Sequence, residues 1–105
     1  MNRKDVKSIK LITGEELIGV IQDANDSSVT IQGPFTVGRT MGSSFILVPW
    51  IVSMTESDVV DVNVNSVIAV ADPDDQFFNA YVNVVNKIGQ DDEDEYNTSP
   101  SAVFH

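Results

Sequence analysis

The chain has 105 residues, of which 42% are hydrophobic and 21% are charged, and it contains no cysteine. This length predicts one domain with a modest core, and the absence of cysteine excludes disulfides and thiolate metal sites. The formal net charge of −10 argues against a generally basic, phosphate-binding surface. The first seven residues have no apolar run behind their charges, so we expect no signal peptide, and no stretch is long enough to span a membrane. The expected location is the cytoplasm, with no membrane partner.

The charges are unevenly distributed along the sequence. Of the six basic residues, four fall within the first ten positions: Arg3, Lys4, Lys7 and Lys10. Five of the sixteen acids form one run, at 91–95. The sequence therefore predicts a positive N-terminal edge and a separate acidic tail.

Residues 6–22 predict a β-hairpin with a bent second strand. Apolar and polar residues alternate on both sides of a short polar turn, which is typical of half-buried strands, here over about 6–13 and 16–22. Gly14 in the turn can adopt the positive φ of a short connection. Gly19 lies within the second strand, where glycine marks a bend, a bulge or a close backbone approach. Such a bend is one way in which a small sheet begins to curl into a barrel.

A third, short strand is expected over 28–32. The pair Gly33–Pro34 is expected to break it, because proline cannot donate to a central ladder. Residues 35–37 resume the strand pattern, and 38–44 are expected to form a flexible loop.

Two later segments are apolar on both faces. Residues 45–52 form a continuous apolar run, which predicts burial on both sides, by the core or by a second subunit. Pro49 indicates that one hydrogen-bonding edge is free or bulged there. Valines alternate with polar residues over 60–65, and 67–70 is a second segment expected to be buried on both faces.

The last predicted element is a helix over about 73–88. Asp72 fits the N-cap position and Pro73 the first helical position, and Gly89 fits the C-cap. An apolar stripe recurs at helical spacing, at Phe77, Tyr81, Val84 and Ile88. Residues 91–105 read as an acidic, disordered tail.

These elements predict a mostly β fold in residues 1–90: a small, bent, five-stranded antiparallel barrel with a C-terminal α-helix. The doubly apolar strands are hard to bury in so small a monomer. We therefore expect strand pairing between subunits, and such an edge-to-edge contact closes into a homo-oligomeric ring.

The segment 11–21, Leu-Ile-Thr-Gly-Glu-Glu-Leu-Ile-Gly-Val-Ile, resembles the first signature of the Sm/LSm family, to which bacterial Hfq belongs. The Asp/Asn/Ser turn at 23–27 and the short strand at 29–31 stand where that family places its next elements. The resemblance covers about the first third of the chain. It implies an SH3-like bent barrel, a homo-oligomeric ring and RNA as the usual ligand.

The sequence departs from the family pattern at the positions that contact RNA. Asn25-Asp26-Ser27-Ser28 replaces an Asp-x-aromatic-or-Met-Asn turn, and Asn63-Val64-Asn65-Ser66 stands where an Arg-Gly or Lys-His pair belongs. The predicted helix also follows the barrel, whereas the family's helix precedes it. No RNA-contacting residue is therefore carried over by motif.

Nine side chains are candidates for nucleic-acid contacts from their chemistry alone, since single-strand binding uses phosphate-facing cations and base-facing polar groups or aromatic platforms. The alternatives are that the cations merely offset the acids and that the polar residues satisfy the backbone of turns. The candidates are Arg3, Lys4, Lys7, Lys10, Arg39, Asn25, Ser27, Asn63 and Asn65. The aromatic residues are expected in the core or an interface, rather than stacked on bases; they are Phe45, Trp50, Phe77, Phe78 and Tyr81.

The residue inventory argues against an enzyme. The only histidine is His105 at the end of the chain, so the usual nucleophile–base pairs are missing, and no phosphate-binding loop is present. Asp72, Asp74 and Asp75 are expected to cap a helix rather than to bind a metal. We expect no catalytic site, no metal and no cofactor.

Two functions remain open from the sequence. The first is an Sm-like ring that binds RNA or single-stranded DNA in nucleic-acid processing or chaperoning. The second is a structural or assembly module that uses the same small β-barrel to bind protein, without a nucleic-acid ligand.

Overall fold

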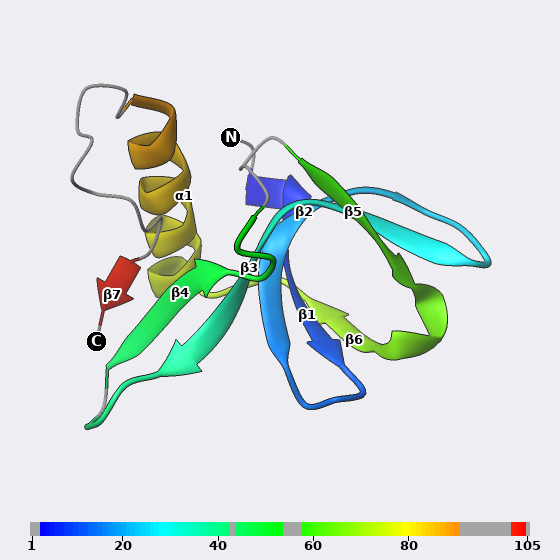
Figure 1. The fold of residues 1–105 in the computed structure, drawn as a ribbon, viewed down its shortest axis with the longest axis horizontal. Coiled ribbons are helices and arrows are strands. Elements are labelled where there is room, and N and C mark those ends of the chain that lie inside the picture. The colour runs from blue at the N-terminus through cyan, green and yellow to red at the C-terminus, as the bar shows by residue number, and fades with distance from the viewer. Residues whose placement is uncertain (1–2, 43, 54–57, 91–101, 105) are drawn as a thin grey trace.

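The computed structural model describes residues 3–42, 44–53, 58–90 and 102–104 (Figure 1). Its elements are η1 (Arg3–Asp5), β1 (Val6–Leu11), β2 (Glu16–Ala24), β3 (Ser28–Arg39), β4 (Phe45–Pro49), β5 (Val59–Asn63), η2 (Val64–Ser66), β6 (Val67–Ala71), α1 (Asp75–Gln90) and β7 (Ala102–Phe104). The prediction of a mostly β fold with one helix towards the C-terminus is confirmed. None of the helices in the described ranges has the length and apolar character needed to cross a membrane.

All strands belong to one antiparallel sheet in the order β6-β1-β2-β3-β4-β7, with β5 paired to β3 beside this path. The predicted count of five strands is wrong, because the sheet formed by the described residues has seven. The strands in this part of the chain also do not close into a barrel. β5 and β6 follow one another in the chain, but η2 lies between them and carries the chain from the β3 side of the sheet to the β1 side.

The predicted hairpin is confirmed as β1 and β2. Gly14 has a φ of 95°, as the tight turn requires. The pairing of β2 with β3 shifts register between Ile18 and Val20, which places Gly19 at the irregularity. A Cβ at Gly19 would lie 2.8 Å from Cγ2 of Ile31. The glycine is therefore needed because β3 passes so close to it.

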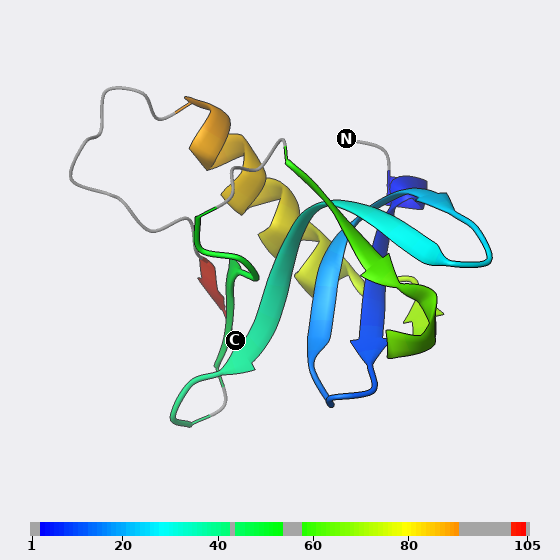
Figure 2. The same ribbon diagram turned by 45° about the vertical axis from the view of Figure 1, so that its right-hand side comes forward.

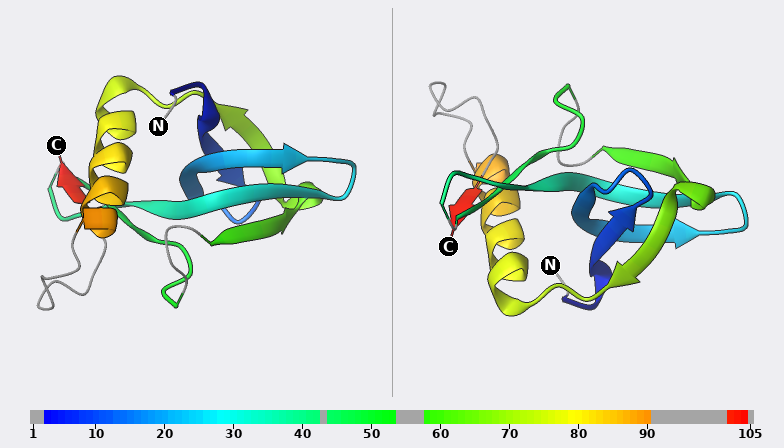
Figure 3. Two further views of the ribbon diagram at one scale, coloured as in Figure 1. Left: turned by 90° about the horizontal axis from the view of Figure 1, so that it is seen from above. Right: turned by 90° about the horizontal axis from the view of Figure 1, so that it is seen from below.

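The predicted break at Gly33–Pro34 is wrong, because β3 continues through it. The strand changes partner there: residues 28–32 pair with β5, and residues 35–39 pair with β4. Pro34 needs no donor at this switch, and its carbonyl accepts a 3.0 Å hydrogen bond from the N–H of Trp50. Figure 3 shows β3 running from the strands β1, β2, β5 and β6 to the side where α1 and β7 lie.

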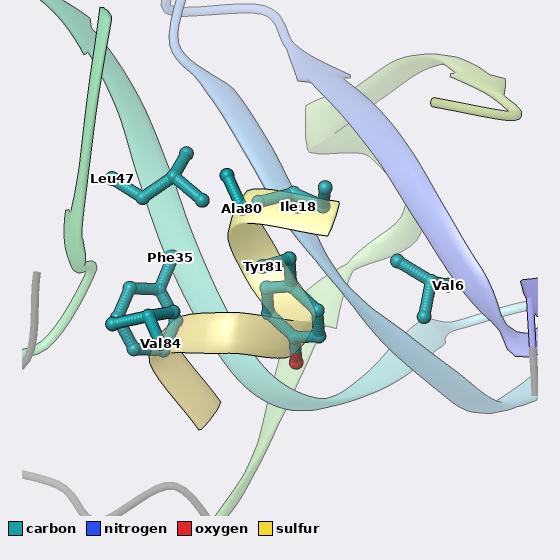
Figure 4. Close-up of a cluster of buried hydrophobic side chains, with 7 residues drawn as sticks. All are labelled: Val6, Ile18, Phe35, Leu47, Ala80, Tyr81 and Val84. Atoms are coloured by element: carbon teal, nitrogen blue, oxygen red, sulfur yellow. The ribbon is translucent and has the colours of Figure 1, made fainter. Parts of the chain in front are cut away.

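The sheet buries apolar side chains on both of its faces. One cluster, which we call the α1 cluster, lies between the sheet and α1 (Figure 4): Val6, Ile18, Phe35, Leu47, Ala80, Tyr81 and Val84. The other, which we call the inner cluster, is built from residues of β1, β2, β3 and β5: Ile9, Leu11, Leu17, Val29, Ile31 and Val62. For the apolar segment 45–52, the sequence analysis left open whether the core or a second subunit buries it. In the structure, Leu47 of this segment is buried in the cluster beneath α1 of the same chain.

Tyr81 connects α1 to the point where β3 changes partner. Its hydroxyl donates a 2.9 Å hydrogen bond to the carbonyl of Gly33, and its side chain is 2% exposed. Its ring meets that of Phe35 edge-on at 5.8 Å. Burial raises the pKa of the Tyr81 hydroxyl above its usual range.

The helix begins two residues later than predicted. Asp74, not Asp72, is the cap, since its Oδ1 accepts a 2.9 Å hydrogen bond from the N–H of Phe77. Asp72 is instead bound by Lys7. At the other end, α1 runs through Gly89 to Gln90, so the expected stop at this glycine is not found.

The expected tail differs from the structure at its far end. Ala102–Phe104 form β7, which pairs with β4 (Figures 1 and 2). The acidic run at 91–95 lies outside the described residues. The expected loop at 38–44 is shorter than predicted, because β3 extends to Arg39.

Candidate functional site

Arg3 is held against the beginning of α1. Its Nη1 lies 2.6 Å from Oδ1 of Asp75, and its Nη2 donates a 3.2 Å hydrogen bond to the carbonyl of Pro73. The guanidinium carbon also lies 4.9 Å from the ring centroid of Phe78. This cation therefore serves the packing of the N-terminus on the helix.

Lys7 is similarly engaged by an acid. Its Nζ lies 2.6 Å from Oδ1 of Asp72. The hydrogen bond and the charge of Lys7, with a smaller contribution from Arg3, hold the pKa of the Asp72 carboxyl below its ordinary value of 3.8. Both ion pairs are exposed to solvent, so each adds modestly to stability.

The other candidate cations do not gather on one surface. Lys4 is exposed in η1, whereas Lys10 is exposed near the other end of β1, opposite Glu16 of β2. Arg39 ends β3 and lies over the ring of Phe45, 5.0 Å from its centroid. The predicted positive N-terminal edge is thus divided between ion pairs and separate places on the sheet.

The four polar candidates occupy two turns, and two of them bond the backbone there. Asn25 Oδ1 accepts hydrogen bonds from the N–H groups of Ser27 (2.7 Å) and Ser28 (2.9 Å). Asn63 Oδ1 accepts a 2.8 Å hydrogen bond from the N–H of Asn65 and so caps η2. For Asn25 and Asn63, the alternative of backbone satisfaction is confirmed.

The fold brings these two turns together, which sequence reasoning did not predict. The N–H of Val64 donates a 2.9 Å hydrogen bond to the carbonyl of Ser27, and Asn63 pairs with Ser28 in the β3–β5 ladder. The side chains of Asn25, Ser27, Asn63 and Asn65 are all exposed. They form one polar surface at the end of β5, which we call the polar turn pair.

The aromatic candidates pack against the cores, as predicted. Phe77 and Phe78 are half-buried against the α1 cluster, and Trp50 against the inner cluster. The rings of Phe45 and Phe77 meet edge-on at 5.2 Å, and Trp50 Nε1 donates a 3.3 Å hydrogen bond to Oε2 of Glu15.

Among the described residues, β6 pairs with β1 alone, so its outer edge is open there. On β1, Leu11 donates its N–H toward β2, so the preceding Lys10 bonds with Ala69 of β6. Val70 alternates with Ala69 and therefore directs its N–H and C=O away from β1. The side chains of Ile68 and Val70 are 62% and 48% exposed. The expected burial of this segment on both faces is not found in the described part of the chain, because Val67 is half-buried and the four residues after it are exposed.

Within the same described ranges β5 pairs with β3 alone, so its outer edge is open as well. The N–H of Gly33 donates to the carbonyl of Asp58, so the ladder between β3 and β5 uses the even-numbered residues of β5. The backbone groups of Val59, Asp61 and Asn63 therefore point away from β3. The Val59 side chain is 53% exposed. The sequence does show two short apolar strands on either side of one turn, here β5 and β6 around η2. That both of them are sheet edges is what sequence reasoning missed.

The described part of the chain contains no cluster of metal-ligating side chains. No three His, Asp or Glu side chains are grouped there to hold a metal ion. His105 lies outside the described residues. The open edges of β5 and β6 and the polar turn pair are the features on which a function is argued below.

No protein-family model matches the sequence, and no curated protein matches it. The function is therefore argued from the edges and the turns themselves.

Proposed function

We propose that this chain is an Sm-like assembly module, in which β5 of one copy pairs with β6 of the next to form a closed homo-oligomeric ring. The single observation that carries the proposal is the pair of open strand edges at β5 and β6. An open edge presents a row of unpaired N–H and C=O groups, which either pairs specifically or promotes aggregation. Because the two edges are different surfaces, their contact is heterologous, and its repetition generates a ring when the rotation closes.

The exposed side chains support the same contact. Val59 lies on one edge and Ile68 and Val70 on the other, so pairing the edges removes apolar surface of all three from water. The chain path places the two edges on different sides of the sheet: β5 pairs with β3, whereas the strand after η2 returns to pair with β1.

Substitutions at exposed positions test the assembly without disturbing the core. Val70→Lys places a charge on the β6 edge, and we expect a shift from the oligomer to a species of 11.5 kDa in sedimentation velocity. Ile12→Lys is the matched control, because Ile12 is 63% exposed in the β1–β2 turn and lies on neither edge. A wild-type chain that sediments as a monomer at tens of micromolar would refute the ring.

A second function, binding of single-stranded RNA or DNA, is favoured by the polar turn pair. In a β5–β6 ring this surface is repeated beside every junction, because Asn63 ends β5. Since Arg3 and Lys7 are held by carboxylates, we propose that contacts go to bases, through amide and hydroxyl groups, rather than to phosphates. A role in nucleic-acid processing or chaperoning follows from this binding.

Oligo-U and oligo-A titrations at low and moderate salt test this second function. We expect weak binding with a shallow salt dependence, since few phosphates are neutralised. Asn65→Ala should weaken it, and Asn65 is chosen because Asn25 and Asn63 bond the backbone through their own side chains. If neither oligonucleotide binds at low salt, the chain is an assembly module only.

A further inference from the structure

We propose that the outer edge of β4, beside α1, is a binding site for a short extended peptide, and that its partner is the C-terminal segment of a second copy of this chain. The chain's own β7 fills the site in the structure. The inference does not depend on the β5–β6 ring, because it concerns a different edge of the sheet.

The hydrogen-bond pattern of β4 identifies which of its groups the site offers. The backbone N–H of Trp50 donates to the carbonyl of Pro34, and the backbone N–H of Thr40 donates at 2.9 Å to the carbonyl of Ser44. Bonded pairs alternate in an antiparallel ladder, so the even-numbered residues of β4 bond with β3. Phe45 and Leu47 therefore direct their backbone groups outward, to the strand β7.

The register of β7 fits this pattern. Phe104 lies opposite Phe45, and Ala102 lies opposite Leu47. These two positions exchange backbone hydrogen bonds with β4, whereas Val103, opposite Ile46, directs its N–H away. The next outward position on β4 is Pro49, which has no N–H to offer, so the site is limited to a short peptide.

α1 makes this edge a defined site rather than a bare strand. Leu47 is fully buried in the cluster beneath the helix, and the Phe45 ring contacts Phe77 of α1. β4 is thus held rigidly before any peptide pairs with it. Figures 1 and 2 both show β7 lying beside β4 and α1.

A three-residue strand is a replaceable occupant. It forms only two bonded pairs, each hydrogen bond being worth about 0.5–1.5 kcal/mol net. It is favoured in its own chain mainly by tethering, which supplies an effective concentration on the order of millimolar. Eleven residues separate Gln90 from Ala102, a length that spans at most about 40 Å when extended and so sets how far the segment can reach from its own helix towards a second copy. Chains concentrated in an assembly would exchange their C-terminal strands.

A labelled peptide of residues 98–105 tests the site on the full-length chain. The first receptor is the full-length Phe104→Pro variant, in which β7 loses a bonded N–H and vacates the edge; the second is the wild-type chain. We expect saturable binding in fluorescence anisotropy, about tenfold tighter to the variant, because the wild-type β7 competes at millimolar effective concentration.

Two backbone-methylated peptides give the decisive comparison, because their side chains are identical. Methylation of the Phe104 nitrogen should weaken binding at least about tenfold, since it removes a ladder bond, whereas methylation of the Val103 nitrogen should change it less than about threefold. Amide hydrogen exchange should slow at Phe45 and Leu47 when the peptide binds, while Ile46, bonded to β3, reports that the fold is intact. The proposal would be overturned if the two methylated peptides bound equally well, or if the unmethylated peptide bound saturably to neither receptor.

Discussion

The close approach of β2 and β3 at Gly19 predicts a specific cost for a single added methyl group. In Gly19→Ala the new Cβ would lie 2.8 Å from Cγ2 of Ile31, 3.2 Å from the carbonyl oxygen of Gln32 and 3.3 Å from Cα of Pro34. Ile31 is β-branched and fully buried, and the other two atoms belong to the backbone, so no neighbour can move freely. Overpacking of this kind costs about 1–3 kcal/mol, and the lost chain entropy of glycine offsets about 0.4–1 kcal/mol.

We therefore expect Gly19→Ala to lower the free energy of unfolding by about 1–2 kcal/mol, which corresponds to a fall of roughly 4–15 °C in Tm for a domain of this size. Gly38→Ala is the matched control: it is also a strand glycine, but its nearest neighbour is Cγ2 of Ile46 at 3.3 Å, and no backbone atom lies closer than 3.9 Å. Urea unfolding followed through the single tryptophan, Trp50, measures both variants. Equal midpoints for the two variants would refute the reasoning.

Two further predictions concern titratable groups. Tyr81→Phe should cost about 1–2 kcal/mol at neutral pH, because the buried carbonyl of Gly33 loses its donor. The raised pKa of Tyr81 means that its contribution is complete below pH 10 and is lost as the pH rises further, so the gap between the wild type and this variant should narrow above pH 10 by about 1.4 kcal/mol per pH unit in alkaline melts. Asp72→Asn should lower Tm at pH 7; because the folded-state pKa of Asp72 is depressed, the difference should vanish as the pH falls below 3.8, and a difference that persists at pH 2 would contradict the Lys7 contact as its cause.

The local features of the hairpin could be predicted from the sequence because they depend on neighbouring residues. The alternation around Gly14 defines two strands and their turn, and Gly19 marks the irregularity of β2. The expectation that one hydrogen-bonding edge is free or bulged at Pro49 agrees with the structure, since Pro49 lies on the outer side of β4 and β7 pairs with residues 45–47.

The features that depend on distant partners could not be predicted. Pro34 was expected to end a strand, but β3 changes neighbours at that residue and needs no donor there. Asp72 was expected to cap the helix, but Lys7, 65 positions away, binds it. A doubly apolar strand such as β6 can be read as buried or as an edge, and periodicity alone does not distinguish these.

The surroundings of the candidate binding residues also depend on partners that are distant in the sequence. The sequence gives the cations as candidates for binding phosphate, but it does not show that Arg3 and Lys7 are bound by acids. Those acids, Asp75 and Asp72, lie near the start of the helix, far along the sequence. The polar turns were identified one by one, and their convergence depends on the β3–β5 pairing. The net charge of −10 and the paired cations together favour assembly over phosphate binding.

Amide hydrogen exchange at the outer edges tests the central proposal most directly. In the ring, the N–H groups of Val70 on β6 and of Val59 and Asp61 on β5 lie between copies, so we predict that their exchange slows as the protein concentration rises. The N–H of Ala69, which bonds with β1 inside one chain, serves as the internal reference. Outer-edge amides that exchange at the rate of an unstructured peptide at every concentration would contradict the account.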